Sequence, residues 1–323
     1  MKKIKHVIAI AILGWIGWVS PSMAAFPEKP LRLIVPYPAG GGGDLMARAM
    51  GVRLGAELGQ QIVIENRGGA GGALAAETVA RAAPDGYTML FGTVGTQAIN
   101  PAIYPNLRYD PLKDFAPISQ THIAPRVLMV RAALPAKNIL ELMALAKKQP
   151  GVLTYGSAGS GSTGHLSGAL FESMAGVDML HVPYRGSAPV VLDLLAGRLD
   201  MTFDSMTAYE EHIKSGKVRV LGVTSKVRMS ILPQTPTLSE SGLVGFEVSN
   251  WLGVLAPVGT PKDVLATLHA ALGRAMSAPA LKEQLLALGI EPTFGSPAEF
   301  DALIRAELVK WAQLVKKSGA TAN

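Results

Sequence analysis

Residues 31–44, LRLIVPYPAGGGGD, contain the pattern from which the fold class of this chain can be inferred. The apolar run Leu31–Val35 predicts a short buried strand, and the apolar spacing that follows Asp44 predicts a helix. Between them, Gly40 to Gly43 form a loop whose backbone can approach a ligand closely. The first turn of such a helix directs unpaired N–H groups and a partial positive charge at the loop. A strand, a glycine loop and a helix in this order indicate a site for an anion.

The same arrangement occurs twice more along the chain. An apolar run at 62–64 precedes the glycine-rich loop 68–72 and a helix that ends at Val79. A third run at 153–155 precedes the loop 156–162 and another helix. Further strands are predicted at 87–91, 127–130, 179–182, 200–203 and 218–221, and a helix at 139–148. This alternation predicts an α/β protein with mostly parallel sheets flanked by helices.

Two regions depart from the alternation. Residues 100–117 are rich in Pro, Asn and Asp and show no period, which predicts a long loop. The C-terminal third reads as mainly helical, with helix starts at Thr260-Pro261 and Ser296-Pro297. Each start combines a hydroxyl as helix cap, proline in the first turn and an acidic residue three positions on.

The length of 323 residues suits two domains. We expect residues 25–124 and 246–323 to form a first lobe and 125–245 a second, with crossings near Ala124-Pro125 and near 245–248. Ligands of open α/β sheets bind beyond the carboxyl ends of the strands. Because two glycine loops then belong to the first lobe and one to the second, the sequence predicts a cleft between the lobes.

The N-terminus reads as a secretory signal over residues 1–24. Lys2, Lys3 and Lys5 precede an apolar stretch of about 13 residues, and Ser22-Met23-Ala24 resembles a cleavage site. A membrane span needs roughly 20 residues, so we expect cleavage rather than anchoring. The chain has no cysteine, which excludes disulfides, thiolate catalysis and a lipid-modified N-terminal cysteine. The prediction is a free periplasmic protein.

Charge and histidine content narrow the function further. Without the leader, 27 basic residues stand against 24 acidic ones, a net charge of +3. No basic run with interleaved aromatic residues occurs, which argues against nucleic acid as a partner. None of the six histidines forms a metal-ligand motif, and no lysine follows a glycine loop as in phosphate loops. We therefore expect no metal and no cofactor.

An exported enzyme that uses the loop Ser157 to Thr163 is the alternative from another class. Residues 159–164, GSGSTG, satisfy the dinucleotide fingerprint, but no acidic residue ends the strand that follows. A serine hydrolase would place its nucleophile between two glycines as G-x-S-x-G, which none of the loop serines does. This alternative stays open as either a hydrolase or a dinucleotide-dependent enzyme.

Several side chains near the loops are candidates for binding. Tyr37 lies between two prolines that fix its backbone, which favours a preorganised wall. Hydroxyls at Ser157, Ser160, Ser162 and Thr163 either cap the following helix or donate to a carboxylate. Asp204 follows an apolar strand and faces either a ligand amine or hydroxyl, or only nearby backbone.

Taken together, these segments resemble the extracytoplasmic solute receptors of tripartite tricarboxylate transporters, the Bug-type binding proteins. The resemblance implies a two-lobed Venus flytrap of the type II-like kind, without catalysis. It is collinear along the whole chain and is carried by PYPAGG (36–41) with Asp44, VIENR (63–67), GAGG (69–72), PDGYT (84–88), YGSAG (155–159) and VPYRG (182–186).

The resemblance also implies a ligand and its partners. The ligand would be a small organic anion: a di- or tricarboxylate, an acidic amino acid or an aromatic carboxylate. A monomeric receptor would deliver it to an inner-membrane permease or a sensor ectodomain. The residues that it implies for the cleft are Tyr37, Pro38, Ala39, Gly40, Ala70, Gly71, Ser157, Ser160, Thr163, Tyr184 and Gly186.

Overall fold

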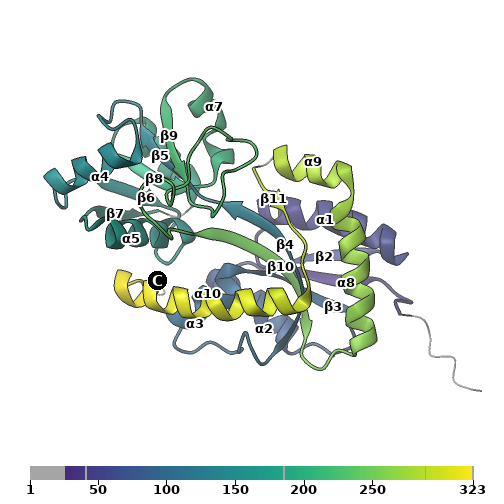
Figure 1. The fold of residues 1–323 in the computed structure, drawn as a ribbon. Coiled ribbons are helices and arrows are strands. Elements are labelled where there is room, and N and C mark those ends of the chain that lie inside the picture. Colours follow the sequence, from purple (N-terminus) through teal and green to yellow (C-terminus); the bar gives the residue numbers. More distant parts are fainter. Residues whose placement is uncertain (1–25, 41, 185, 288, 322–323) are drawn as a thin grey trace, which may run out of the picture.

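The structure is a computed structural model that describes residues 26–40, 42–184, 186–287 and 289–321. The signal segment expected at 1–24 lies outside the described residues. Two β-sheets flanked by helices form two lobes that lie side by side (Figure 1). The predicted α/β, two-lobed architecture is confirmed.

The first sheet has six strands in the order β11-β4-β10-β3-β1-β2. β1 pairs in parallel with β2 and with β3, as the strand–loop–helix pattern predicts. β10 runs antiparallel to β3 and β4, and β11 runs antiparallel to β4. The strands are β1 (Leu31–Val35), β2 (Ile62–Asn66), β3 (Thr88–Thr93), β4 (Phe115–Pro125), β10 (Ser249–Pro257) and β11 (Glu291–Pro292).

The second sheet has five strands in the order β7-β6-β8-β5-β9. Its strands are β5 (Val127–Arg131), β6 (Thr154–Ser157), β7 (Leu180–Pro183), β8 (Met201–Asp204) and β9 (Val218–Val223). β6 is parallel to β7 and β8, whereas β5 is antiparallel to β8 and β9. Both sheets are thus mixed, and the expectation of mostly parallel sheets is wrong. Every antiparallel pair includes β4, β5 or β10, strands that carry the chain between the sheets.

The prediction of a long loop over 100–117 is wrong at both of its ends. A helical turn, η2 (Gly95–Ile99), continues into α3 (Asn100–Ile103), and β4 already begins at Phe115. The mainly helical C-terminal third likewise contains β10 and β11, which the pattern did not predict. β4 carries buried polar residues, and it is paired along its length by β10, which lies far away in the sequence.

Helices cover the faces of both sheets (Figure 1). The capping box predicted at Ser296 is present, with its hydroxyl accepting from the Glu299 N–H. At the other predicted start Pro261 is the cap residue, and the Thr260 hydroxyl instead donates to the Pro257 carbonyl. None of the described helices is both long and apolar enough to cross a membrane. The remaining helices are α1 (Gly42–Leu58), η1 (Ala70–Gly72), α2 (Ala73–Ala80), α4 (Ile139–Lys148), α5 (Thr163–Ala175), α6 (Ser187–Leu195), η3 (Met206–Ala208), α7 (Glu210–Lys214), α8 (Lys262–Ser277), α9 (Pro279–Ala287) and α10 (Pro297–Ser318).

The C-terminal helix α10 connects the two lobes on one side. It runs along the first lobe and reaches α5 of the second with its C-terminal end (Figure 1). There the Lys317 ammonium donates to the Ser173 hydroxyl at 2.5 Å. One continuous buried cluster includes Leu90 of the first sheet, Tyr155 of the second and Trp311 of α10. The lobes therefore share apolar packing behind the crossings.

The two crossings between the sheets are linked through Thr224, which is hydrogen-bonded to Arg126. Its N–H donates to the Thr224 hydroxyl oxygen and its carbonyl accepts from the Thr224 N–H, both at 2.9 Å. The Val248 N–H donates to the Thr224 carbonyl at 2.9 Å. Because Thr224 is fully buried, the crossing is a closed network of backbone and hydroxyl groups.

Candidate functional site

A cavity of about 440 Å³ lies where the loops of the two sheets meet. A larger hollow of about 850 Å³ lies between α1 and β2 at the edge of the first sheet, and none of the described glycine-loop residues lines it. The smaller cavity is therefore the candidate site. Its lining comprises Pro36, Tyr37, Gly69, Gly71, Gly72, Thr93, Val94, Gly95, Ile99, Asn100, Ile103, Tyr104, Arg126, Ala158, Gly159, Ser160, Gly161, Ser162, Thr163, Asn250 and Thr321.

Asp44 organises the first glycine loop. It lies in the first turn of α1, where its carboxylate accepts from the Gly40 N–H at 2.8 Å and from Arg48 Nε at 2.9 Å. The Asn66 amide donates both to Asp44 and to the Tyr37 carbonyl. Hydrogen bonding to Arg48, followed by the bonds from Gly40 and Asn66, lowers the pKa of Asp44 to about 2. Asp44 thus ties the loop to α1 instead of contacting the cavity.

Tyr37 packs its ring directly on the backbone of α1. A Cβ atom added at Gly43 would lie 2.0 Å from Tyr37 Cδ2, so only glycine fits beneath the ring. Burial raises the pKa of Tyr37, and hydrogen bonds with Asn250 and Thr93 and the charge of Arg126 oppose that rise. The tyrosine is therefore a fixed wall of the cavity with its hydroxyl among polar groups.

The second loop is a run of left-handed backbone. Gly69, Ala70, Gly71 and Gly72 all have positive φ, at 103°, 48°, 61° and 85°. The Asn100 amide donates to the Gly71 carbonyl at 3.0 Å and closes the loop against α3. α2 begins directly behind it, with Gly72 as its cap residue. Successive turns of this kind form a concave surface suited to an anion.

The third loop is held by its own helix. Ser162 caps α5 by accepting from the His165 N–H at 3.3 Å, and the Gly161 N–H donates to His165 Nδ1 at 3.0 Å. His165 stacks on His181 with ring centroids 3.9 Å apart. His181 Nε2 in turn lies 2.7 Å from the Ser157 hydroxyl. Burial lowers the pKa of both histidines, that of His181 to about 4, so the pair is neutral at neutral pH.

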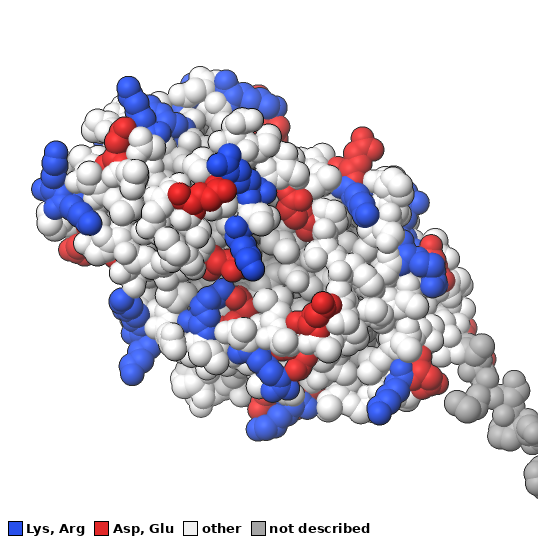
Figure 2. Space-filling model, viewed as in Figure 1, with Lys and Arg blue, Asp and Glu red and all other residues white. Residues whose placement is uncertain are grey.

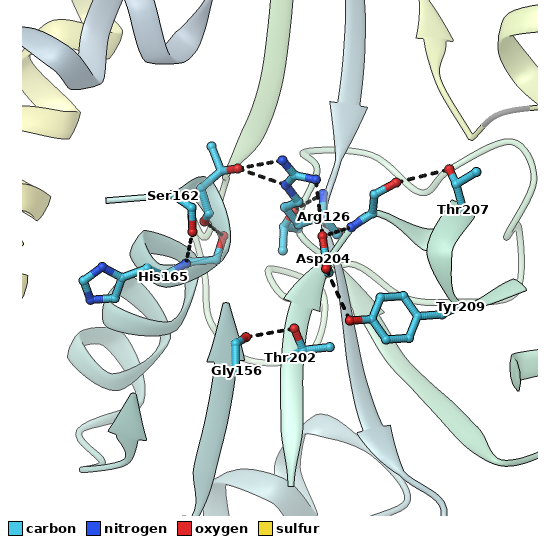
Figure 3. Close-up of polar contacts among 12 residues, drawn as sticks. Arg126, Gly156, Ser162, His165, Thr202, Asp204, Thr207 and Tyr209 are labelled. Carbon is cyan, nitrogen blue, oxygen red and sulfur yellow. Dashed lines mark hydrogen bonds and ion pairs between the residues drawn. The ribbon is translucent and has the colours of Figure 1, made fainter. Parts of the chain in front are cut away.

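Arg126 is the functional candidate that sequence reasoning missed. Its guanidinium donates to the Thr163 hydroxyl oxygen from Nε at 3.0 Å and from Nη2 at 2.8 Å (Figure 3). Nη1 lies 3.8 Å from Asp204 Oδ1. Among the described residues that line the cavity, Arg126 is the only charged one. The available signal was a basic residue directly after the predicted crossing at Ala124-Pro125.

Asp204 is the ion-pair partner of Arg126. Its carboxylate accepts from the Ser205 N–H at 2.7 Å and from the Tyr209 hydroxyl at 3.2 Å, and only 5% of the residue is exposed. Burial raises the pKa of Tyr209, followed in effect by the charge of Asp204. Asp204 is not among the lining residues, so in this structure it supports Arg126 (Figure 3).

The predicted site residues divide into two groups. Tyr37, Gly71, Ser160 and Thr163 line the cavity. Pro38, Ala39, Gly40 and Ala70 are exposed outside it, and Ser157 is buried beneath it. The Tyr184 hydroxyl donates to Asp193 at 2.6 Å, and Gly186 is the N-terminal cap residue of α6. Ser162, whose hydroxyl is also a candidate, lines the cavity too. Polar lining residues that the sequence did not single out are Thr93, Asn100, Tyr104, Arg126, Asn250 and Thr321.

Charge elsewhere is dispersed. Lys and Arg are interspersed with Asp and Glu over the face shown in Figure 2. In the described part of the chain, no cluster of three or more His, Cys, Asp or Glu side chains is arranged to hold a metal ion.

Comparison with known proteins gives a consistent result. Residues 46–320 match the sequence model of the tripartite tricarboxylate transporter family receptor. The chain is 34% identical to protein BugT of Bordetella pertussis over 322 residues, which cover 99% of this chain and 98% of BugT. It is 41% identical to a UPF0065 protein from the tcbD-tcbE intergenic region of Pseudomonas sp. strain P51, over 93% of this chain and 89% of that protein.

Solved structures of periplasmic binding proteins are also similar to this chain. Rpa4515 of R. palustris with adipate superposes with a TM-score of 0.79 at 37% identity, over 92% of this chain and 99% of that one. MatC of Rhodopseudomonas palustris with bound malate gives a TM-score of 0.75 at 34% identity, over 90% of this chain and all of MatC.

Proposed function

Because this chain belongs to the tripartite tricarboxylate transporter receptor family, we propose that it captures a small organic carboxylate in the cavity between its two lobes. The convergence of loops from both sheets on one cavity carries the proposal. The similar proteins Rpa4515 and MatC were solved with adipate and with malate, which are small carboxylates.

The residues that line the cavity favour an anionic ligand. A carboxylate taken from water needs replacement hydrogen bonds, since an unpaired buried charge is costly. The loop at Gly71, the hydroxyls of Ser160 and Thr163, and the hydroxyl of Tyr37 offer donors on different walls. Arg126 adds positive charge, and no carboxylate side chain stands among the described lining residues.

We propose that the lobes comprise residues 25–124 with 246–323, and 125–245, and that they close around the ligand. Closure by a hinge completes contacts from both walls and is driven by the higher affinity of the closed state. In the same proposal Pro38, Ala39, Gly40, Ala70, Tyr184, Gly186 and Asp204 shape the loops, and Ser157 supports the third one from below. The loaded receptor, a monomer, would be recognised in the periplasm by a permease or a sensor ectodomain after its leader is removed.

A catalytic role for the contact between Ser157 and His181 has little support. A nucleophile must reach its substrate, and Ser157 is only 1% exposed and does not line the cavity. Its hydroxyl lies 3.0 Å from the Gly159 carbonyl, a local bond that closes the third loop.

Thermal unfolding with a panel of carboxylates, amines and neutral sugars tests the proposal. A bound carboxylate should raise the free energy of unfolding by about 2.7 kcal/mol at a concentration one hundred times its Kd. Small-angle scattering should show compaction with the same compound. Stabilisation by amines or sugars alone would contradict the proposal, as would turnover of any compound in the panel.

A further inference from the structure

Resting on the proposed function, we propose that Arg126 determines the charge of the ligand. It binds a second acidic group, separate from the one held at the glycine loops of the first sheet, and it excludes ligands that carry an ammonium group at that end. Arg126 is thereby a specificity-determining residue of the cavity.

The hydrogen-bond geometry of Arg126 leaves donors for such a group. A guanidinium has five N–H donors and prefers a carboxylate that accepts two of them in parallel. Nε and Nη2 both point at one oxygen, that of Thr163. Nη1 is 3.8 Å from Asp204, which is beyond hydrogen-bonding distance. Among the described residues, Nη1 therefore has an ion-pair partner but no acceptor in hydrogen-bonding contact.

Asp204 forms an ion pair with the Arg126 guanidinium but accepts no hydrogen bond from it. Both of its oxygens already accept hydrogen bonds, from Ser205 and from Tyr209. The side chains of Arg126 and Asp204 are 18% and 7% exposed, so the pair is shielded from water while the arginine still reaches the cavity. A partly buried cation with a distant partner interacts strongly with an incoming anion, because the local dielectric constant is low.

A second positive feature reinforces Arg126. Thr163 is the first residue of α5, a helix of 13 residues whose N-terminus carries partial positive charge. An ammonium group at this end would meet two repulsive features and, among the described lining residues, no carboxylate. It would remain an uncompensated buried charge, which is unfavourable.

The cavity has its other anion-binding feature on a different wall. The left-handed turn at Gly71 and Gly72 belongs to the first sheet, whereas Arg126 lies at the crossing and contacts the second lobe through Thr163. A ligand with an acidic group at each end would bridge these walls. Because the backbone of Arg126 is bonded to Thr224 in the crossing, ligand charge would act directly on the segment that joins the lobes.

Calorimetric titration with matched ligands tests the inference. The probes are straight-chain dicarboxylates from malonate to suberate, the monocarboxylate and the monoamide of each, and aspartate and glutamate. The wild type should bind its best dicarboxylate about ten- to a hundredfold more tightly than the matched monoamide, as expected for a charge-assisted contact. Aspartate and glutamate should bind more weakly than the dicarboxylate of equal length.

Arg126→Gln should lose that preference, binding the dicarboxylate and its monoamide within about twofold of each other. Monoamide affinity should stay near that of the wild type. Arg198→Gln is the matched control, since Arg198 pairs with Asp193 on the exterior and does not line the cavity. It should retain the wild-type preference.

The inference is wrong if the wild type binds monoamides as tightly as dicarboxylates, or if Arg126→Gln weakens both equally. Either result leaves the proposed receptor function intact, whereas binding of no carboxylate at all contradicts that function instead. If Arg126→Gln does not fold, the ligand series on the wild type still tests the inference, because monoamides that bind as tightly as dicarboxylates would contradict it.

Discussion

The guanidinium of Arg126 donates two hydrogen bonds to one oxygen, the hydroxyl of Thr163, at 3.0 and 2.8 Å. Arg126 lies at the crossing between β4 and β5, and Thr163 opens α5 in the second lobe. The contact therefore joins the segment between the two sheets to the first residue of α5 on the wall of the cavity.

Replacing Thr163 by valine tests how much this contact stabilises the folded protein. Thr163→Val removes the acceptor for two charged donors and should lower the free energy of unfolding by about 1.5–3 kcal/mol. Thr163→Ser keeps the hydroxyl and should lose less than about 1 kcal/mol. Urea unfolding of both variants measures the difference, and equal losses would show that the hydrogen bonds stabilise the protein no more than the methyl group does.

The first loop offers a matched pair of glycines. Gly43→Ala places a methyl group 2.0 Å from the Tyr37 ring and should destabilise the protein by about 1–3 kcal/mol through overpacking. Gly42→Ala meets no atom within 4 Å and should be nearly neutral. Thermal unfolding and the fluorescence of a bound carboxylate analogue would report both effects. An equal cost for the two variants would contradict the packing of Tyr37 on Gly43.

Substitutions at Gly161 and Ile103 test how closely the two lobes contact each other. A Cβ at Gly161, in the third loop, would lie 2.5 Å from Ile103 Cδ1 on α3. Gly161→Ala should therefore weaken closure, seen as a larger radius of gyration in small-angle scattering with carboxylate present. Gly176→Ala is the control, since φ is also positive there, at 63°, but the added methyl group meets no atom within 4 Å.

Ile103→Ala should rescue the Gly161→Ala variant, because it removes the atom that the new methyl group would meet. Restored compaction in the double variant identifies a steric cause. If the double variant stays as expanded as Gly161→Ala, the effect comes from the left-handed backbone alone and the cross-lobe contact is not the reason.

His122 should make the protein labile to acid. It is fully buried on β4, and its Nδ1 lies 2.6 Å from the Thr121 hydroxyl. Burial lowers its pKa to about 3, whereas in the unfolded chain it is near 6.5. Between these values the unfolded state binds one more proton, so stability falls as the pH falls, by about 1.4 kcal/mol per pH unit.

In His122→Gln the free energy of unfolding should depend less steeply on pH, by the contribution of one proton. His165 and His181, whose pKa values are also lowered, still contribute to the pH dependence of the variant. Urea unfolding between about pH 5 and pH 8 gives both slopes. Above about pH 7 the two proteins should show parallel curves. Identical slopes over the acidic range would exclude His122 as a contributor.

Local sequence patterns were sufficient for much of the fold. The run LRLIV forms β1, and Ser296 caps α10, because strand and cap signals depend on residues that are neighbours in the chain. The three strand, glycine loop and helix units are present at β1, β2 and β6, with the resulting parallel pairs of β1. Gly43 and Gly72 occupy positions that larger residues would not fit.

The site depended on contacts that no sequence window contains. β4 owes its strand conformation to β10, whose residues follow more than a hundred positions later, so its polar composition misled the prediction. Arg126 became a candidate only because the fold brings it to Thr163 and Asp204, and Asn250 only because β10 returns beside the crossing. The α/β units and the glycine loops could be predicted from sequence because they rest on local periodicity and backbone freedom, and the resemblance to the family rests on short motifs along the chain. Which side chains share the cavity depends on the fold, because strand pairing and burial bring distant residues together and leave some charged groups without a full set of hydrogen bonds.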